Sequence, residues 1–209
     1  MIPVTIRDIP DVFSVLAAPG ALLAASAGSA QAAVAPSVVP SITLPADTRK
    51  GFGHGGKDAL ALTQIQSLKL DWYYIWSARS YVTTSPPFVP MIKDARRLLE
   101  QDAIGWVTRQ RAETRTKHLL GFNEPDHRAQ ANMSVDEAIR LWPKLVATGL
   151  RLGSPAPAGT DSLWLESFMA KAKGLRVDFV TMHRYAWPKA DDFLNKVTML
   201  HEKYKSRCG

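Results

Sequence analysis

The sequence predicts an α/β fold of the (β/α)8 TIM-barrel type, incomplete here, with about six strand–helix units present. Short apolar runs alternate with amphipathic segments at helical spacing, and the runs are apolar throughout. Both features are typical of a parallel sheet that helices cover on both faces. Polar and aromatic residues also follow several of the runs. This third observation favours a barrel over an open doubly wound sheet, because a barrel site collects residues from the carboxyl ends of many strands.

The expected elements follow one another in a regular order. The helix that begins near Ser134 is the clearest of them, because Ser134 and Glu137 form a capping box and apolar residues follow at helical spacing. The expected strands cover residues 51–52, 70–76, 88–92, 119–123, 150–154 and 177–183. The expected helices cover residues 57–68, 94–101 with a continuation to 117, 134–148, 162–173 and 191–204.

The N-terminal part of the chain has a different composition from the rest. Residues 12–27 form an apolar, alanine-rich run, and residues 30–32 have the A-x-A pattern that signal peptidase cuts. These features predict an export signal and hence a secreted or periplasmic protein. An alanine-rich disordered tail is the alternative, because two nearby aspartates offset the charge of Arg7. The expected parts are a leader over residues 1–32, a Pro/Ala-rich linker over 33–48 and a barrel domain over 49–209.

The net charge of +7 raises the question of nucleic-acid binding. The basic residues are dispersed, and the densest basic run, residues 109–117, also contains Glu113 and has the pattern of a solvated helix face. We therefore expect no nucleic-acid partner. No apolar run reaches the ~18 residues that a membrane-spanning helix needs, so no membrane span is expected. The sequence does not define an oligomeric state.

Cofactor motifs are weak or missing. Cys208 is the only cysteine, and the five histidines show no metal-ligand spacing, so we expect no metal site. Residues 51–56 contain a G-x-G-x-x-G pattern, but a dinucleotide site needs a preceding strand, which the proline-rich linker does not provide. We therefore expect no nucleotide cofactor.

Aromatic and polar residues gather at the carboxyl ends of three expected strands. An apolar run ends abruptly at Asn123 and Glu124, which Pro125 follows. Aromatic rings that can stack on pyranose faces, together with polar groups that can take hydroxyls, describe a sugar-binding site. The candidate binding residues are Tyr73, Tyr74, Trp76, Asn123, His183, Tyr185 and Trp187.

Glu124 is the candidate catalytic residue. Bonds between sugars are cleaved by two carboxyl groups, of which one protonates the leaving oxygen and the other attacks the anomeric carbon or activates water. Glu124 suits the proton donor, Asn123 is placed to hydrogen-bond a sugar hydroxyl, and Pro125 stiffens the chain just past the acid. The alternative is that the acids cap the following turn, which is the reading we favour for Asp126.

A series of motifs in this order resembles glycoside hydrolase family 128, the alkali-sensitive-linkage-protein-like catalytic domain. They are WYYIW, FVPMI, LLGFNEPD, QANMS, LWP, LRLGSPAP, WLESFM and RVDFVTMHRY, over about residues 50–204. The resemblance implies a (β/α)8 barrel that hydrolyses β-1,3-glucans with retention. It implies Glu124 as acid/base and Asn123 as the partner of the sugar 2-hydroxyl. The family's usual His-Trp-Tyr maps onto residues 183–185, where Arg184 replaces the common Trp.

Family members continue into a strand of roughly Trp-x-Thr-Glu-Phe, whose Glu is the nucleophile. The sequence shows no such strand, so we expect a truncated copy without its nucleophile. Asp178 is expected at the wrong end of its strand and Glu166 on the outside of a helix, which leaves Asp161 as the only reachable substitute. The alternatives are a catalytically inactive β-glucan-binding barrel or truncated pseudoenzyme, and a basic wall-associated protein.

Overall fold

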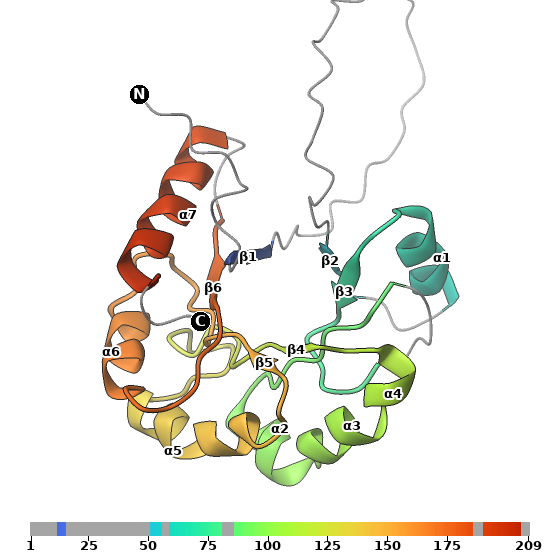
Figure 1. The fold of residues 1–209 in the computed structure, drawn as a ribbon, viewed down its shortest axis with the longest axis horizontal. Helices are drawn as coiled ribbons and strands as arrows, with labels where there is room; N and C mark the ends of the chain where they lie inside the picture. The colour runs from blue at the N-terminus through green and yellow to red at the C-terminus, as the bar shows by residue number, and fades with distance from the viewer. Residues whose placement is uncertain (1–11, 16–50, 56–58, 81–85, 186–189, 206–209) are drawn as a thin grey trace, which may run out of the picture. The chain divides into compact units, whose positions relative to one another are not determined.

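The computed structural model describes residues 12–15, 51–55, 59–80, 86–185 and 190–205 of the chain. All of them belong to one structural unit, which comprises residues 1–17 and 49–209, and its fold mixes α and β elements (Figure 1). The strands are β1 Val12–Val15, β2 Gly51–Gly53, β3 Trp72–Tyr74, β4 His118–Leu119, β5 Arg151–Leu152 and β6 Val180–His183. The helices are α1 Ala59–Ser67, α2 Ala95–Glu100, α3 Ala103–Arg109, α4 Arg111–Thr114, α5 Val135–Val146, α6 Leu163–Lys171 and α7 Ala190–Tyr204.

Every described strand pairing is parallel. The ladders join β2 with β3, β4 with β5, and β1 with β6. Pairings of single residues connect these ladders in chain order, through residues 88–91 between β3 and β4, and from β5 to the start of β6. The prediction of parallel strands and intervening helices is therefore confirmed, whereas a complete barrel stays a prediction. Residues 88–92 were expected to form a full strand, but the structure has only the single pairings of Phe88 and Met91 there.

Strand β1 was not among the expected strands, since it lies within the segment predicted to be a leader. Val12 to Val15 pair in parallel with Val180 to His183, and this pairing occupies one edge of β6. A short, mostly apolar run that contains two valines suits a strand as well as the apolar part of an export signal. The leader itself stays a prediction.

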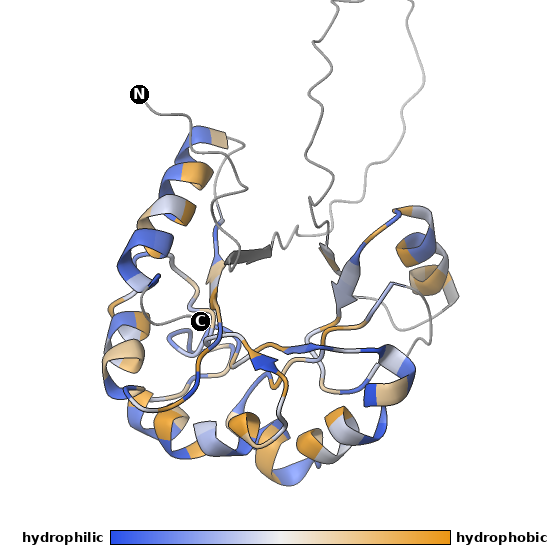
Figure 2. Cartoon of the chain, viewed as in Figure 1, coloured by the Kyte–Doolittle hydropathy of each residue, from blue (hydrophilic) through white to orange (hydrophobic). Residues whose placement is uncertain are grey.

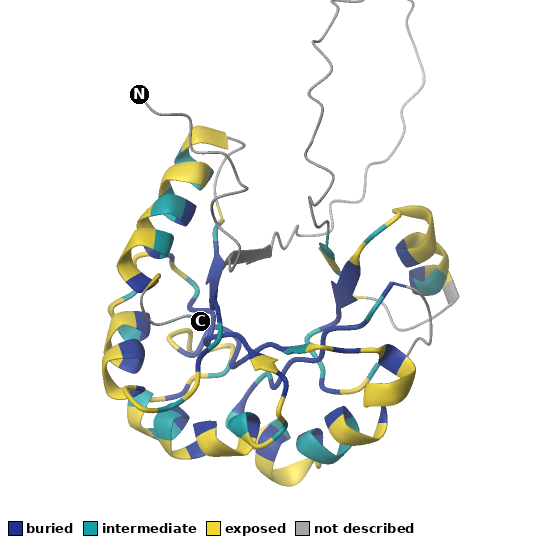
Figure 3. Ribbon diagram, in the orientation of Figure 1, coloured by how far each residue is buried: buried dark blue, intermediate teal, exposed yellow. Residues whose placement is uncertain are grey.

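The helices cover one face of the strands and bury their apolar sides against them. Figure 3 shows the buried residues of α5 and α6 toward the strands and the exposed ones away from them, and Figure 2 shows the matching hydropathy pattern. At the centre of this core, the Trp142 ring makes edge contacts with Phe122 and Phe168. Trp164 stacks on Phe168 with an interplanar angle of 10°. Trp142 is fully buried in this core, and the half-buried Trp164 packs against it.

The opposite face of the strands holds a second, smaller cluster. It is made of Trp72, Tyr74, Val89, Met91, Leu120 and Phe179, with Trp76 packed against it. Tyr73 instead belongs to a third cluster, with Ile65 of α1, Ile75 and Phe88. Because side chains alternate along a strand, Tyr73 and Tyr74 must face opposite sides of β3.

The long helix expected over residues 94–117 is divided into α2, α3 and α4. Asp102, before α3, and Arg115, after α4, both adopt the left-handed backbone conformation, with φ of 49° and 53°. A continuous α-helix cannot contain such a residue, so the backbone turns at Asp102. At the start of α2, the Asp94 side chain accepts a hydrogen bond from Arg97 N. None of the described helices is long and apolar enough to cross a membrane.

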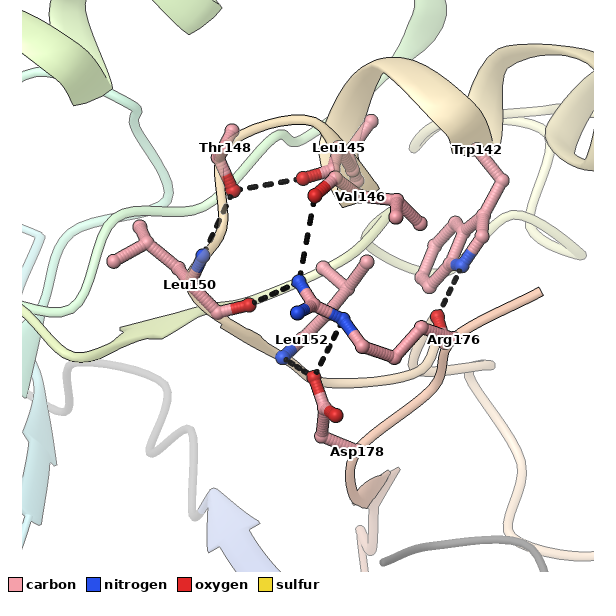
Figure 4. Close-up of polar contacts among 8 residues, drawn as sticks. All are labelled: Trp142, Leu145, Val146, Thr148, Leu150, Leu152, Arg176 and Asp178. Atoms are coloured by element: carbon pink, nitrogen blue, oxygen red, sulfur yellow. Dashed lines mark hydrogen bonds and ion pairs between the residues drawn. The ribbon is translucent and has the colours of Figure 1, made fainter.

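A polar network ties the amino-terminal ends of β5 and β6 together (Figure 4). Arg176 Nη2 donates to Leu150 O at 2.7 Å, and Arg176 Nε lies 3.3 Å from Asp178 Oδ2, which also accepts from Leu152 N at 2.7 Å. The Trp142 indole donates to Arg176 O at 2.9 Å. The network therefore fixes the loop before β6 to β5 and to α5.

Replacing Arg176 with alanine should lower the free energy of unfolding by about 1–3 kcal/mol, because it removes the cation that pairs with Asp178 and the donor to Leu150 O. Chemical denaturation at neutral pH measures this change. The matched control is Lys173→Ala, an exposed cation three positions earlier, for which we expect a change within about 0.5 kcal/mol. Equal effects of the two substitutions would show that the network does not stabilise the fold.

Candidate active site

Glu124 lies where the pairing of β4 with β5 ends. Beyond the two strands, Asn123 still pairs with Ala156, and Glu124 N donates to Ala156 O at 2.7 Å. Glu124 itself has a φ of 45°. The left-handed conformation costs a residue other than glycine roughly 1–3 kcal/mol, and such strain is concentrated at functional sites. The hydrogen bond from Glu124 N to Ala156 O holds the backbone of Glu124 in place against this strain.

Three side chains converge on one carboxylate oxygen. Glu124 Oε1 lies 2.7 Å from His183 Nδ1 and accepts a hydrogen bond of 2.5 Å from the Tyr185 hydroxyl. The Tyr185 hydroxyl also lies 3.4 Å from His183 Nδ1. Glu124 is 6% exposed and His183 3% exposed, whereas Tyr185 is 56% exposed. The carboxyl group and the imidazole are thus shielded from water, and the tyrosine ring is open to it.

Strand β3 brings two further aromatic residues to this side of the sheet. Tyr74 is fully buried, and its ring centre lies 4.6 Å from that of Trp76. Its hydroxyl group is buried and has no hydrogen-bond partner among the described residues. Burial raises the pKa of Tyr74 far above its usual value of 10.0, and the nearby charges of Tyr185 and Glu124 raise it further. Burial and the hydrogen bond to Glu124 also raise the pKa of Tyr185, so both phenols keep their protons at a pH at which a free tyrosine has lost its own.

Raising the pH should therefore destabilise the fold from about pH 10 upward. In the unfolded chain Tyr74 loses its proton near pH 10.0, whereas in the folded chain it keeps the proton to a higher pH. Its contribution is fully present below pH 10 and falls above it by at most about 1.4 kcal/mol per pH unit.

Urea denaturation between pH 8 and 11 measures this loss. Tyr74→Phe removes the titrating group, and the difference between the two proteins cancels the titration of the lysines. We expect Tyr74→Phe to be at least as stable as wild type at pH 8, because it removes a buried hydroxyl that has no hydrogen-bond partner among the described residues. Parallel curves for the two proteins would contradict the prediction.

Asn123 adjoins the carboxyl group and is 2% exposed. Its Nδ2 donates to Gln130 Oε1 at 3.3 Å, while its buried Oδ1 has no hydrogen-bond partner among the described residues. A buried acceptor without a partner costs about 1–3 kcal/mol. The Asn123 oxygen and the Tyr74 hydroxyl are therefore well suited to bind hydroxyl groups of a ligand. Gln130 lies within the QANMS motif, but no pattern in the sequence singles it out as a site residue.

The structure does not bring every predicted residue to this site. Tyr73 points to the other side of β3, where its hydroxyl lies 2.9 Å from Ser80 Oγ and its ring packs against Phe88. The expectation that all the aromatic residues of this strand face one site does not hold for Tyr73. Trp187 lies outside the described residues. Arg184 forms an ion pair with Asp192 of α7.

The other candidate carboxylates are engaged elsewhere. Asp126, which we expected to cap a turn, accepts from Ala158 N and Ser162 Oγ at 2.8 Å each and so caps the segment before α6. The remaining three form ion pairs: Asp161 with Lys196, Glu166 with Lys203, and Asp178 with Arg176. Among the described residues, no group of three histidine, cysteine or acidic side chains could hold a metal ion.

Comparison with known proteins identifies the family to which this chain is similar. The model of the glycosyl hydrolase catalytic core matches residues 51–208. Alkali-sensitive linkage protein 1 of Schizosaccharomyces pombe is 28% identical over 140 residues, which are 61% of this chain but only 24% of that protein.

Solved structures of glycoside hydrolase family 128 resemble the chain in fold. A mutant of a subgroup I endo-β-1,3-glucanase from Amycolatopsis mediterranei, in complex with laminaripentaose, is 34% identical with a TM-score of 0.66. The match covers 76% of this chain and 68% of that one. A subgroup III curdlan-specific exo-β-1,3-glucanase from Blastomyces gilchristii, in complex with glucose, is 28% identical with a TM-score of 0.58, over 75% of this chain and 71% of that one. The chain therefore belongs to the glycosyl hydrolase catalytic core family, with a domain of the glycoside hydrolase family 128 type.

Proposed function

We propose that this chain acts on β-1,3-glucan, with Glu124 as the acid/base of a glycosidase site. The observation that carries the proposal is the contact of Glu124 with His183 and Tyr185 at the carboxyl ends of parallel strands. Such strand ends form the active site of a (β/α)8 barrel, which we propose as the complete architecture of the domain. The similar endo- and exo-β-1,3-glucanases support the choice of substrate.

Each side chain of the site would have a separate role in binding or cleaving the glucan. Glu124 would protonate the leaving oxygen of the glycosidic bond, and the Tyr185 hydroxyl and His183 would set the position of its Oε1. Asn123 Oδ1 would accept a hydrogen bond from a sugar hydroxyl. The exposed ring of Tyr185 and the ring of Trp76 would supply the apolar faces on which pyranose rings stack.

Hydrolysis with retention further requires a second carboxyl group about 5–5.5 Å from the first. We assign this role to none of the four candidates Asp126, Asp161, Glu166 and Asp178, because each is held by other partners. This observation favours a second candidate function, in which the domain binds β-glucan through the same residues without cleaving it.

One experiment separates the two functions. The purified chain is incubated with laminarihexaose, the products are separated by chromatography, and binding is measured by calorimetry, with the β-1,4-linked cellohexaose as the control ligand. Shorter laminari-oligosaccharides would support the glycosidase, and binding without products would support the binding domain. If laminarihexaose neither binds nor reacts, both proposals are wrong.

A further inference from the structure

The segment of residues 156–162, between β5 and α6, contacts both halves of the active site. We refer to it as the bridge loop. At its start, Ala156 O accepts from Glu124 N at 2.7 Å, and Ala156 N donates to Phe122 O at 3.0 Å. Further along, Ala158 N and Ser162 Oγ donate to the two carboxylate oxygens of Asp126. The bridge loop thus forms hydrogen bonds with Phe122, before Glu124, and with Asp126, after it.

Thr160 joins the same loop to the other half of the site. Its hydroxyl donates to the carbonyl oxygen of His183 at 2.9 Å, and both residues are buried. His183 is the last residue of β6, where the strand ladder ends. A buried carbonyl at such an end needs a partner from outside the ladder, and Thr160 supplies it. Lys196 of α7 pairs with the next residue, Asp161, and so fastens the loop from outside.

The bridge loop therefore connects two residues that are far apart in sequence but touch in space. Glu124 and His183 are 59 positions apart, and their side chains lie 2.7 Å from each other. Glu124 also has the strained φ of 45°. A hydrogen bond of this length is sensitive to small shifts of either backbone, and a shift of ~1 Å at a catalytic group can cost about 100-fold in rate.

We propose that Thr160 is a positioning residue, which sets the place of the His183 imidazole against Glu124 Oε1 through the His183 carbonyl. The consequence for catalysis or glucan binding rests on the function proposed above. The geometric consequence does not: loss of the Thr160 hydroxyl changes the environment of the His183 ring, whether or not the chain cleaves glucan.

Thr160→Val tests the proposal, because valine keeps the shape of threonine and lacks the hydroxyl. The ring ¹H–¹⁵N resonances of His183 are assigned by comparison with His183→Asn and then recorded for each variant. We expect Thr160→Val to shift these resonances and to weaken laminarihexaose binding about fivefold, the loss expected from one misplaced hydrogen bond. Thr160→Ser, which restores the hydroxyl, should return both to near wild-type values.

Thr116 provides a matched control. Its buried hydroxyl also donates to the carbonyl of a histidine, His118, and also at 2.9 Å, but at the start of β4. Thr116→Val should lower stability about as much as Thr160→Val, and leave the His183 resonances and the binding unchanged. Unchanged His183 resonances in Thr160→Val, or equal shifts in both variants, would overturn the proposal. If the wild-type chain binds no glucan, the proposed function fails, while the resonances still decide the role of Thr160.

Discussion

Replacing Glu124 with glutamine is expected to slow the hydrolysis of laminarihexaose about 100- to 10,000-fold, the usual contribution of a general acid. Glutamine has the same shape, and its Oε1 can still accept the hydrogen bond from Tyr185. It cannot, however, protonate the leaving oxygen of the glycosidic bond. The rate of appearance of reducing ends measures the effect, and near-ultraviolet circular dichroism shows that the fold is kept.

The same variant should bind laminarihexaose within about threefold of wild type, because the stacking rings and the Asn123 amide remain. Glu166→Gln is the control, since it makes the same chemical change on the outside of α6, where Glu166 pairs with Lys203. We expect it to leave both rate and affinity unchanged. A Glu124→Gln protein that keeps more than a tenth of the activity would show that another group donates the proton.

The sequence predicts the convergence of Glu124 and His183 because parallel strands end at the same edge of a sheet. Both residues follow apolar runs, so their proximity depends only on the order and direction of the strands. The side of the sheet on which Tyr73 lies depends on the exact register of its strand. A shift of one residue in register moves every side chain of a strand to the other face, and three adjacent aromatic residues give no sign of which ones face the site.

Other features leave no pattern in the sequence. Thr160 is one of two hydroxyl residues in the bridge loop, and its importance depends on the carbonyl of His183, which only the folded chain brings near. The break at Asp102 depends on one left-handed residue in a stretch whose composition suits a helix. Strand β1 has the apolar composition of a leader, and its pairing with β6 exists only in the folded chain.

Replacing Gly121 with alanine is expected to destabilise the fold by roughly 2–4 kcal/mol, which places it among the costly substitutions of this chain. A Cβ atom at Gly121 would lie 2.8 Å from Gly153 O and 3.0 Å from Pro155 N. These are backbone atoms of the segment that follows β5, so no side-chain rotation can relieve the contact. The two segments would have to separate where Ala156 N donates to Phe122 O. Chemical denaturation measures the loss.

Two other glycines show whether this crowding is the cause. A Cβ at Gly153 would lie 2.5 Å from the buried Phe179 ring, a side chain that can shift at some cost in packing, whereas a Cβ at Gly159 would meet nothing within 4 Å. We therefore expect Gly121→Ala to lower the free energy of unfolding more than Gly153→Ala does. Gly159→Ala should stay within about 0.5 kcal/mol of wild type. If Gly121→Ala and Gly159→Ala lowered the free energy of unfolding equally, the cause would be the lost backbone freedom of glycine and not crowding. Because Glu124 lies three residues beyond Gly121 and donates to Ala156 O, separating these strands would also displace the proposed acid.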